Sequence, residues 1–286
     1  MSRYKNICLI GNFDLFTGLH LKIISSINSI TDHLTIVVLD DNIGSTLACS
    51  DIIIPYENRL NIIQSVRGLS NVMVIKDIRE LFKQDSNPFE AFFLADNYTG
   101  NTGLLKNLIG TFSPEASLYD YFATQSLSET LLPNFFNEDY KIPTRPLNND
   151  DLIGYTTGVY DMFHIGHLNL LRRAKEKCDF LVVGVSTDEC VQNYKNKTPI
   201  VPFKERIRIV KSIKYVDEVV PQTDMNKVNF LRSYHFDVMF HGDEWKGTPL
   251  YNKYEIEFKK YGARIEFLSH TEGISSSLLR TKIEKR

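Results

Sequence analysis

The stretch LIGYTTGVYDMFHIGH, residues 152–167, decides the fold of the second half of this 286-residue chain. Residues 152–157 read as a strand, and after a short turn apolar residues recur at helical spacing over 168–174. A second apolar strand at 180–186 completes a strand–helix–strand unit. Further strands are predicted at 218–220, 236–240 and 264–268, with a helix that begins after Pro202. We therefore predict an α/β fold with a doubly wound parallel sheet, whose ligands bind at the carboxyl ends of the strands.

Two histidines three residues apart, His164 and His167, lie where the turn enters the first helix. Unpaired backbone N–H groups and the positive end of the helix dipole favour an anion at such a position. Gly166, between the histidines, lets a phosphate approach the backbone closely. Imidazoles beside a phosphate can stabilise charge during phosphoryl transfer. Two other interpretations stay open here, in which the histidines cap the turn or bind zinc.

A shift of 147 residues places the first half of the chain on the second half without a gap. Gly11-Asn12-Phe13-Asp14 then falls on Gly158-Val159-Tyr160-Asp161, and His20 falls on His167. This register extends over most of each half and indicates an internal duplication. We predict two tandem domains, 1–133 and 152–286, joined by a polar linker at 134–151.

Composition narrows the function classes. Lysine and arginine number 33 against 35 acidic residues, a net charge of −2 that excludes a protein which coats nucleic acid or acidic lipid. The 43% of hydrophobic residues excludes a disordered chain. The four cysteines form no C-x-x-C pair, and the apolar run near the N-terminus is too short for a signal sequence or a membrane span. We expect a cytoplasmic location, with no nucleic-acid partner and no membrane span.

Several ordered motifs of the second half resemble the cytidylyltransferase family, whose members make CDP-activated alcohols. After the histidine motif come, in order, Val183–Glu189, Lys195 and Lys197, Tyr215–Val219, His241–Trp245 and Thr271–Ser277. The last of these is similar to the family's second signature. The resemblance implies two Rossmann-like nucleotidyltransferase domains in tandem and a CTP-dependent enzyme.

The implied reaction joins CTP to a phosphorylated alcohol, giving a CDP-alcohol and pyrophosphate, with glycerol 3-phosphate the nearest family substrate. By the resemblance, His164, His167 and Lys195 are catalytic: the histidines hold the CTP phosphates, and the lysine bridges the α-phosphate and the substrate phosphate. Lys195, Arg206 and Lys227 are assigned to the substrate. The nucleotide-binding residues are Gly158, Val159, Tyr160, Gly166, Lys197, Asp243, His270, Thr271, Glu272, Gly273, Ile274, Ser275, Ser276 and Ser277. Mg²⁺ is implied by the triphosphate and not by a cluster of ligands in the sequence.

Two departures from the family pattern stand out. The second signature usually begins with arginine, and His270 stands there, without the planar, permanently charged fork of a guanidinium. In the first half Thr17 replaces the first histidine, and Ala48, Ser50, Ala123 and Ser126 replace Lys195, Lys197, His270 and Gly273. We therefore expect the first copy to be catalytically silent.

Other functions and assemblies remain open. Adenylyl transfer from ATP uses a similar histidine turn, although Lys195 and residues 271–275 favour the cytidylyl branch. A non-catalytic nucleotide-binding or assembly module is a third interpretation. The resemblance also admits an intramolecular pseudo-dimer of the two halves, or a homo-oligomer.

Overall fold

The computed structural model describes residues 4–69, 71–82, 89–96, 102–113, 115–120 and 150–285. The chain divides into two compact units, Met1–Asn137 and Glu138–Arg286. All but the last two residues of the predicted linker lie outside the described ranges, as do Ala123 and Ser126.

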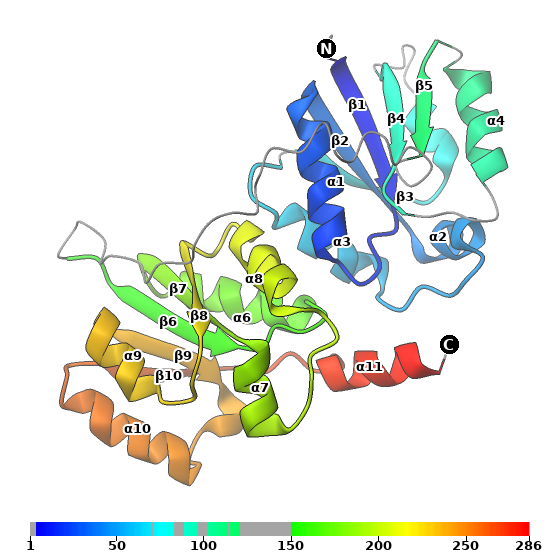
Figure 1. The fold of residues 1–286 in the computed structure, drawn as a ribbon. Coiled ribbons are helices and arrows are strands. Elements are labelled where there is room, and N and C mark those ends of the chain that lie inside the picture. The colour runs from blue at the N-terminus through cyan, green and yellow to red at the C-terminus, as the bar shows by residue number, and fades with distance from the viewer. Residues whose placement is uncertain are drawn as a thin grey trace. The chain divides into compact units, whose positions relative to one another are not determined.

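The first unit contains a five-stranded parallel sheet with the strand order β3-β2-β1-β4-β5. Helices alternate with the strands along the chain (Figure 1). The elements are β1 (Tyr4–Gly11), α1 (Gly18–Ser29), β2 (Thr31–Leu39), α2 (Asp41–Ala48), α3 (Tyr56–Gln64), β3 (Asn71–Ile75), a 3₁₀ turn (Ile78–Phe82), β4 (Ala91–Leu94), α4 (Thr102–Phe112) and β5 (Ser117–Asp120).

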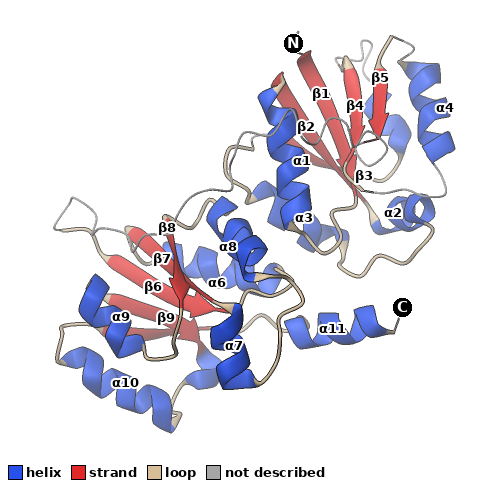
Figure 2. Ribbon diagram, viewed as in Figure 1, coloured by secondary structure: helices blue, strands red, loops and turns tan. Residues whose placement is uncertain are grey.

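The second unit repeats this topology, with five parallel strands in the order β10-β9-β6-β7-β8 (Figure 1). Helices again alternate with its strands (Figure 2). Its elements are β6 (Ile153–Gly158), α6 (Ile165–Lys175), β7 (Phe180–Ser186), α7 (Asp188–Lys195), α8 (Phe203–Ser212), β8 (Glu218–Gln222), α9 (Lys227–Tyr234), β9 (Val238–Gly242), a 3₁₀ turn (Asp243–Trp245), α10 (Pro249–Lys259), β10 (Arg264–Leu268) and α11 (Ser276–Glu284). The predicted doubly wound α/β fold is confirmed, and the strands predicted at 180–186 and 264–268 have the predicted bounds.

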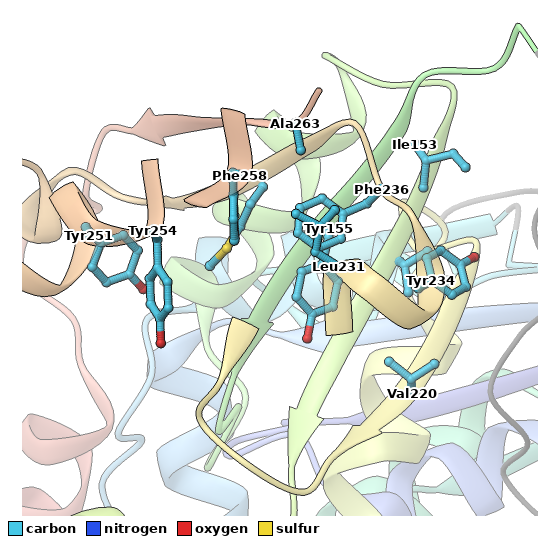
Figure 3. Close-up of a cluster of buried hydrophobic side chains, with 12 residues drawn as sticks. Ile153, Tyr155, Val220, Leu231, Tyr234, Phe236, Tyr251, Tyr254, Phe258 and Ala263 are labelled. Carbon is cyan, nitrogen blue, oxygen red and sulfur yellow. The ribbon is translucent and has the colours of Figure 1, made fainter. Parts of the chain in front are cut away.

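Aromatic side chains fill the core between the second sheet and helices α9 and α10 (Figure 3). The ring of Tyr155 on β6 stacks between Phe230 and Phe236, with centroids 4.2 and 5.0 Å away. Its neighbour Gly154 faces the other side of the sheet, where an added Cβ would lie 2.5 Å from the Cys178 sulfur just beyond α6. Period-two alternation therefore places α6 opposite α9 and α10.

The parallel register brings the carboxyl ends of β6, β7 and β8 to one edge of the second sheet. Gly158 pairs with Val185, and Ser186 pairs with Gln222. Side chains that follow these strands share a small region, as expected for a doubly wound sheet. None of the described helices is long and apolar enough to cross a membrane.

Candidate active site

The histidine motif forms the entry to α6. His164 is the N-cap residue, with extended backbone, and its Nδ1 accepts the Gly166 N–H at 3.1 Å. Nδ1 of His167 accepts the His164 N–H at 3.4 Å, and the two imidazoles stack with centroids 3.8 Å apart. The capping interpretation of the sequence is therefore correct for His164, but it uses only one nitrogen of each ring.

These hydrogen bonds fix which nitrogen carries the proton. Because both Nδ1 atoms accept from the backbone, the neutral rings carry their proton on Nε2. Nε2 of His164 lies 3.4 Å from the Ser276 hydroxyl, which donates to the Asp161 carbonyl at 2.8 Å. The start of α11 is thus linked to the start of α6, and both rings present an N–H donor that suits a phosphate oxygen.

The environment keeps both imidazoles uncharged in the absence of a ligand. Burial, with the nearby charge of His270, lowers the pKa of His164 to about 4. Burial and the charges of His164 and Lys195 hold the pKa of His167 well below its usual value. A bound triphosphate would raise the pKa of both imidazoles, because its negative charge favours the protonated rings. These electrostatics suit a site that binds an anion.

Gly166 keeps the His164 ring in place. A Cβ at this position would lie 2.9 Å from Cε1 and 3.0 Å from Nδ1 of His164. Gly166→Ala is expected to displace the imidazole and lower turnover by about 100-fold, the scale of a 1 Å misplacement. Steady-state kinetics measure this, with Gly103→Ala as the control, because a Cβ there meets nothing. Normal turnover in Gly166→Ala would show that the observed ring position is not the one used.

The segment 269–277 lies against α6 and the end of β9. Asn169 on α6 donates to the Thr271 hydroxyl at 3.2 Å, and the His270 N–H donates to Asp243 Oδ1 at 3.1 Å. Gly273 has φ +76°, a left-handed conformation that favours glycine. The segment is thereby held close to the histidine motif.

The segment ends at the N-terminus of α11. Ser275 caps the helix by accepting the Leu278 N–H at 3.1 Å, and Ser276 reaches His164. His270, Glu272 and Ser277 are exposed, whereas the Ile274 side chain lies beside Gly166. The helix start and the histidines therefore form one continuous surface that donates hydrogen bonds.

Lys195 ends α7, and Asn196 follows it in the left-handed conformation, φ +51°. Partial burial and the charge of Lys197 lower the pKa of Lys195, while Asp161 opposes that shift. The charge of Lys195 also lowers the pKa of His167, so the lysine and the histidine motif belong to one site. Lys197 is exposed beside it.

A second cation, Lys227, is buried in the first turn of α9. Its Nζ donates to the Thr157 hydroxyl at 3.2 Å, and no carboxylate among the described residues pairs with it. Burial lowers the pKa of Lys227 to about 8, although Cys190 and Asp224 partly oppose the shift. A buried ammonium without a carboxylate partner suits an anionic ligand. This geometry favours the substrate contact predicted for Lys227.

Around Lys227, the sequence predicted the motif residues His241 and Trp245 but not the polar contacts of Thr157 and Gln222. Thr157 also bonds to Gln222, whose Oε1 accepts from Ser186 at 3.1 Å, so three strand ends supply one polar wall. On the other side, His241 packs edge-on against Trp245 and Tyr251, with centroids 5.6 and 4.8 Å away. The polar residues share one sequence signal, since each is the last or next-to-last residue of its strand: Thr157 of β6, Ser186 of β7, Gln222 of β8 and His241 of β9.

Arg206 has a different position from the one expected of a substrate ligand. Its guanidinium is fully buried and donates to the carbonyls of Val201, Val159 and Ser186 at 2.9, 2.5 and 2.8 Å. It also pairs with Asp188 at 2.6 Å. These contacts use the donors of the guanidinium within the protein. We therefore reassign Arg206 from the substrate to positioning the loop after β6.

The loop residues Gly158, Val159 and Tyr160 divide into backbone and side-chain roles. The Tyr160 ring is buried and lies 5.2 Å from the His167 ring, so it supports the histidine and does not face solvent. Asp161 accepts the Ile200 and Val201 N–H groups at 2.9 and 2.8 Å, which fixes the loop from below. What the loop can offer a nucleotide is therefore its main chain.

Three imidazoles with lowered pKa values make the second unit sensitive to acid. The pKa values of His164 and His241 are about 4 and about 3, and that of His167 is also depressed, mainly through burial. Because the unfolded rings titrate near 6.5, the stability they confer is complete above about pH 6.5 and is lost as the pH falls toward 4.

The expected loss between pH 7 and pH 5 is on the order of 1 kcal/mol per imidazole, a decrease of several degrees in unfolding temperature. Trp245 is the single tryptophan of the chain, so its fluorescence reports the second unit alone. His241→Gln should flatten the pH dependence. Equal slopes in the two proteins would contradict the assignment.

Comparison with known proteins identifies the family. A family model described as cytidylyltransferase-like matches residues 8–97 and 155–282, most of the chain. The chain belongs to the cytidylyltransferase-like family. The family and the enzyme class predicted from the sequence, a CTP-dependent nucleotidyltransferase, are thereby confirmed.

Curated relatives of this cytidylyltransferase-like protein match about half of its length. Glycerol-3-phosphate cytidylyltransferase of Staphylococcus aureus is 36% identical over 45% of this chain and 92% of its own. Ethanolamine-phosphate cytidylyltransferase of Arabidopsis thaliana is 36% identical over 43% of this chain and 30% of its own. A crystal structure of a lipopolysaccharide core biosynthesis protein from Thermoplasma volcanium GSS1 covers 42% of this chain and 97% of its own, at 23% identity and a TM-score of 0.37.

Within the described ranges, no group of three or more histidine, cysteine, aspartate or glutamate side chains could hold a metal ion. The zinc interpretation of His164 and His167 thus gains no third ligand there. The same donors do not form a protein site for Mg²⁺, so we assign no step to a metal held by the chain.

Proposed function

We propose that the second unit joins CTP to a small phosphorylated alcohol, with glycerol 3-phosphate the favoured substrate. An oxygen of the alcohol phosphate attacks the α-phosphorus of CTP in line. The bond from that phosphorus to the β-phosphate oxygen breaks, and pyrophosphate leaves with the electron pair. The products are CDP-glycerol and pyrophosphate. The name and coverage of the S. aureus relative support this choice of substrate.

The observation that carries the proposal is the shared orientation of the two imidazoles. Each Nδ1 is occupied by a backbone N–H, which leaves an Nε2–H donor on each ring at the start of α6. In the proposed reaction these donors stabilise the charge that shifts toward the leaving pyrophosphate. The N-terminus of α11, at Ser275–Ser277, receives the β- and γ-phosphates.

Two lysines contact the phosphate of the alcohol substrate in this proposal. Lys227, which is buried and donates to the Thr157 hydroxyl, binds the phosphate of the alcohol at the polar wall. Lys195, at the end of α7, lies between that phosphate and the α-phosphate of CTP and neutralises the two anions as they approach. Mg²⁺ enters with the triphosphate in this scheme. We place the reaction in the cytoplasm and the first unit outside the chemistry.

A pyrophosphate-release screen tests the proposal. Each of the four nucleoside triphosphates is combined with glycerol 3-phosphate, phosphoethanolamine, phosphocholine and a sugar 1-phosphate. Release is expected with CTP and glycerol 3-phosphate and is expected to fall by about 10²–10³-fold in His164→Ala. Release with ATP but not CTP would favour adenylyl transfer, and no release with any pair would favour a binding module.

A further inference from the structure

In the first unit, a carboxylate sits on the loop that follows β1. Oδ2 of Asp96 accepts the Asn12 N–H at 2.6 Å and the Phe13 N–H at 3.3 Å. Oδ1 lies 3.2 Å from Nε2 of His20. Three N–H donors, two from the backbone and one from an imidazole, therefore meet one oxyanion.

The loop itself is the same in both units. Phe13 and Leu15 have φ +53° and +52°, and their counterparts 147 residues later, Tyr160 and Met162, have φ +56° and +47°. Non-glycine residues seldom adopt these values. Because they recur at both matched positions, the backbone of the loop has the same conformation in the two units. The N–H groups of Asn12 and Phe13 thus correspond to those of Val159 and Tyr160.

The carboxylates at the matched position behave differently. Asp243, the counterpart of Asp96, accepts the His270 N–H at 3.1 Å. Within residues 150–285, neither the Val159 N–H nor the Tyr160 N–H has a hydrogen-bond partner. The second unit leaves open the donors that the first unit satisfies with its own side chain.

The histidine of the first unit is arranged to hold this carboxylate. His20 Nδ1 accepts the Thr17 N–H at 3.1 Å, so its proton lies on Nε2, toward Asp96. The ring stacks on Phe16 at 5.8 Å and meets Phe13 edge-on at 5.4 Å. His20 thus has the same tautomer as His167, with an oxygen of Asp96 as its acceptor.

Gly11 makes room for the carboxylate. A Cβ at Gly11 would lie 2.9 Å from Asp96 Oδ2 and 2.8 Å from the Ala95 Cβ. Burial by itself would raise the pKa of Asp96, but hydrogen bonds from His20, Asn12 and Phe13 outweigh it, and the net pKa is lowered. The carboxylate is therefore stable as an anion in this position.

We propose that the first unit retains the oxyanion site of a nucleotidyltransferase domain and fills it with its own Asp96, which takes the place of a nucleotide phosphate. The unit is self-liganded: phosphate is excluded while the carboxylate is present. Removal of the carboxylate uncovers a site for a phosphate or pyrophosphate group.

Hydrogen–deuterium exchange of the full chain tests this, because it reads the two units separately. The reporter is the peptide that spans residues 9–16, with pyrophosphate as the probe. In the wild type this peptide should be protected and indifferent to pyrophosphate. In Asp96→Ala the exchange of its two loop amides should rise by about tenfold or more, the scale of lost charge-assisted hydrogen bonds, and pyrophosphate should restore protection.

Two controls accompany the measurement. A peptide from β2, residues 33–39, reports whether the unit stays folded. If Asp96→Ala unfolds it, Asp96→Asn keeps the shape without the charge and should show a smaller rise and a weaker pyrophosphate effect. Because the readout is local to residues 9–16, it is independent of any activity in the second unit.

Three results would overturn the proposal. Pyrophosphate protection of the peptide in the wild type would mean that the site is open. Unchanged exchange in a folded Asp96 variant would mean that the carboxylate does not cap the loop. Faster exchange that pyrophosphate does not reverse would mean that the loop is no oxyanion site.

Discussion

His164→Ala is expected to lower turnover by about 10²–10³-fold while the second unit stays folded. In the proposed reaction the imidazole Nε2–H stabilises charge that develops as pyrophosphate departs, and removal of one such donor has an effect of this size. The ring also contacts the start of α11 through Ser276, so the substitution can also shift the position of α11. Steady-state kinetics give the loss, and the Trp245 unfolding transition shows whether the fold is intact.

The matched position in the first unit supplies the control. Thr17 stands where His164 stands, and His20 contacts the unit's own Asp96. His20→Ala should therefore leave turnover nearly unchanged. A large loss in His20→Ala, or near-normal turnover in a folded His164→Ala, would contradict the assignment of chemistry to the second unit.

Much of the fold could be predicted because the spacing of apolar residues along the chain indicates each strand and helix. Apolar runs of five to seven residues, each followed by helical spacing, gave the alternating order, and parallel pairing follows from that order. The first and last residues of the strands were harder to predict. The strand predicted at 236–240 is Val238–Gly242, because Phe236 and Asp237 precede the first pairing residue and Phe236 packs against Tyr155.

The part of the site formed by one contiguous motif could be predicted from the sequence. The part formed by residues far apart in the chain was harder to predict. His164, Gly166 and His167 lie within four residues, and their geometry follows from one helix start. Thr157, Gln222 and Lys227 come together only when three strand ends and α9 meet. Sequence alone gives Lys227 a charge but not the burial that makes it a candidate anion ligand.

Asp96 shows the same limit in the first half. The losses at Thr17 and Ala48 predict a silent copy, since they remove phosphate-binding groups. The carboxylate that takes the phosphate position lies 84 residues after Asn12, and its role depends on the side chain turning toward the loop. Its counterpart Asp243 carries the same side chain and has a different partner. Identity at a matched position therefore does not determine contact.

Arg206→Met is expected to destabilise the second unit by about 3–5 kcal/mol. The guanidinium is fully buried, so its removal leaves the carbonyls of Val159, Val201 and Ser186 without a donor and Asp188 without its partner. Urea unfolding followed by Trp245 fluorescence measures the loss in this unit. A substrate ligand would behave otherwise, since its removal would raise KM and leave the unfolding midpoint in place.

The first unit contains the same arrangement at Arg59. This second arginine helps to distinguish a role in stability from a role in substrate binding. Its guanidinium is fully buried, donates to the Ile54 and Leu39 carbonyls at 2.7 and 2.9 Å, and pairs with Asp41 at 2.6 Å. The presence of the same contacts in a unit that we place outside the chemistry supports a structural role for both guanidinium groups. Arg59→Met should destabilise the first unit by a similar amount, measured by exchange of its β2 peptide. If Arg206→Met keeps the wild-type unfolding midpoint and raises KM for the alcohol phosphate, the guanidinium reaches the substrate after all, and its assignment to the loop is wrong.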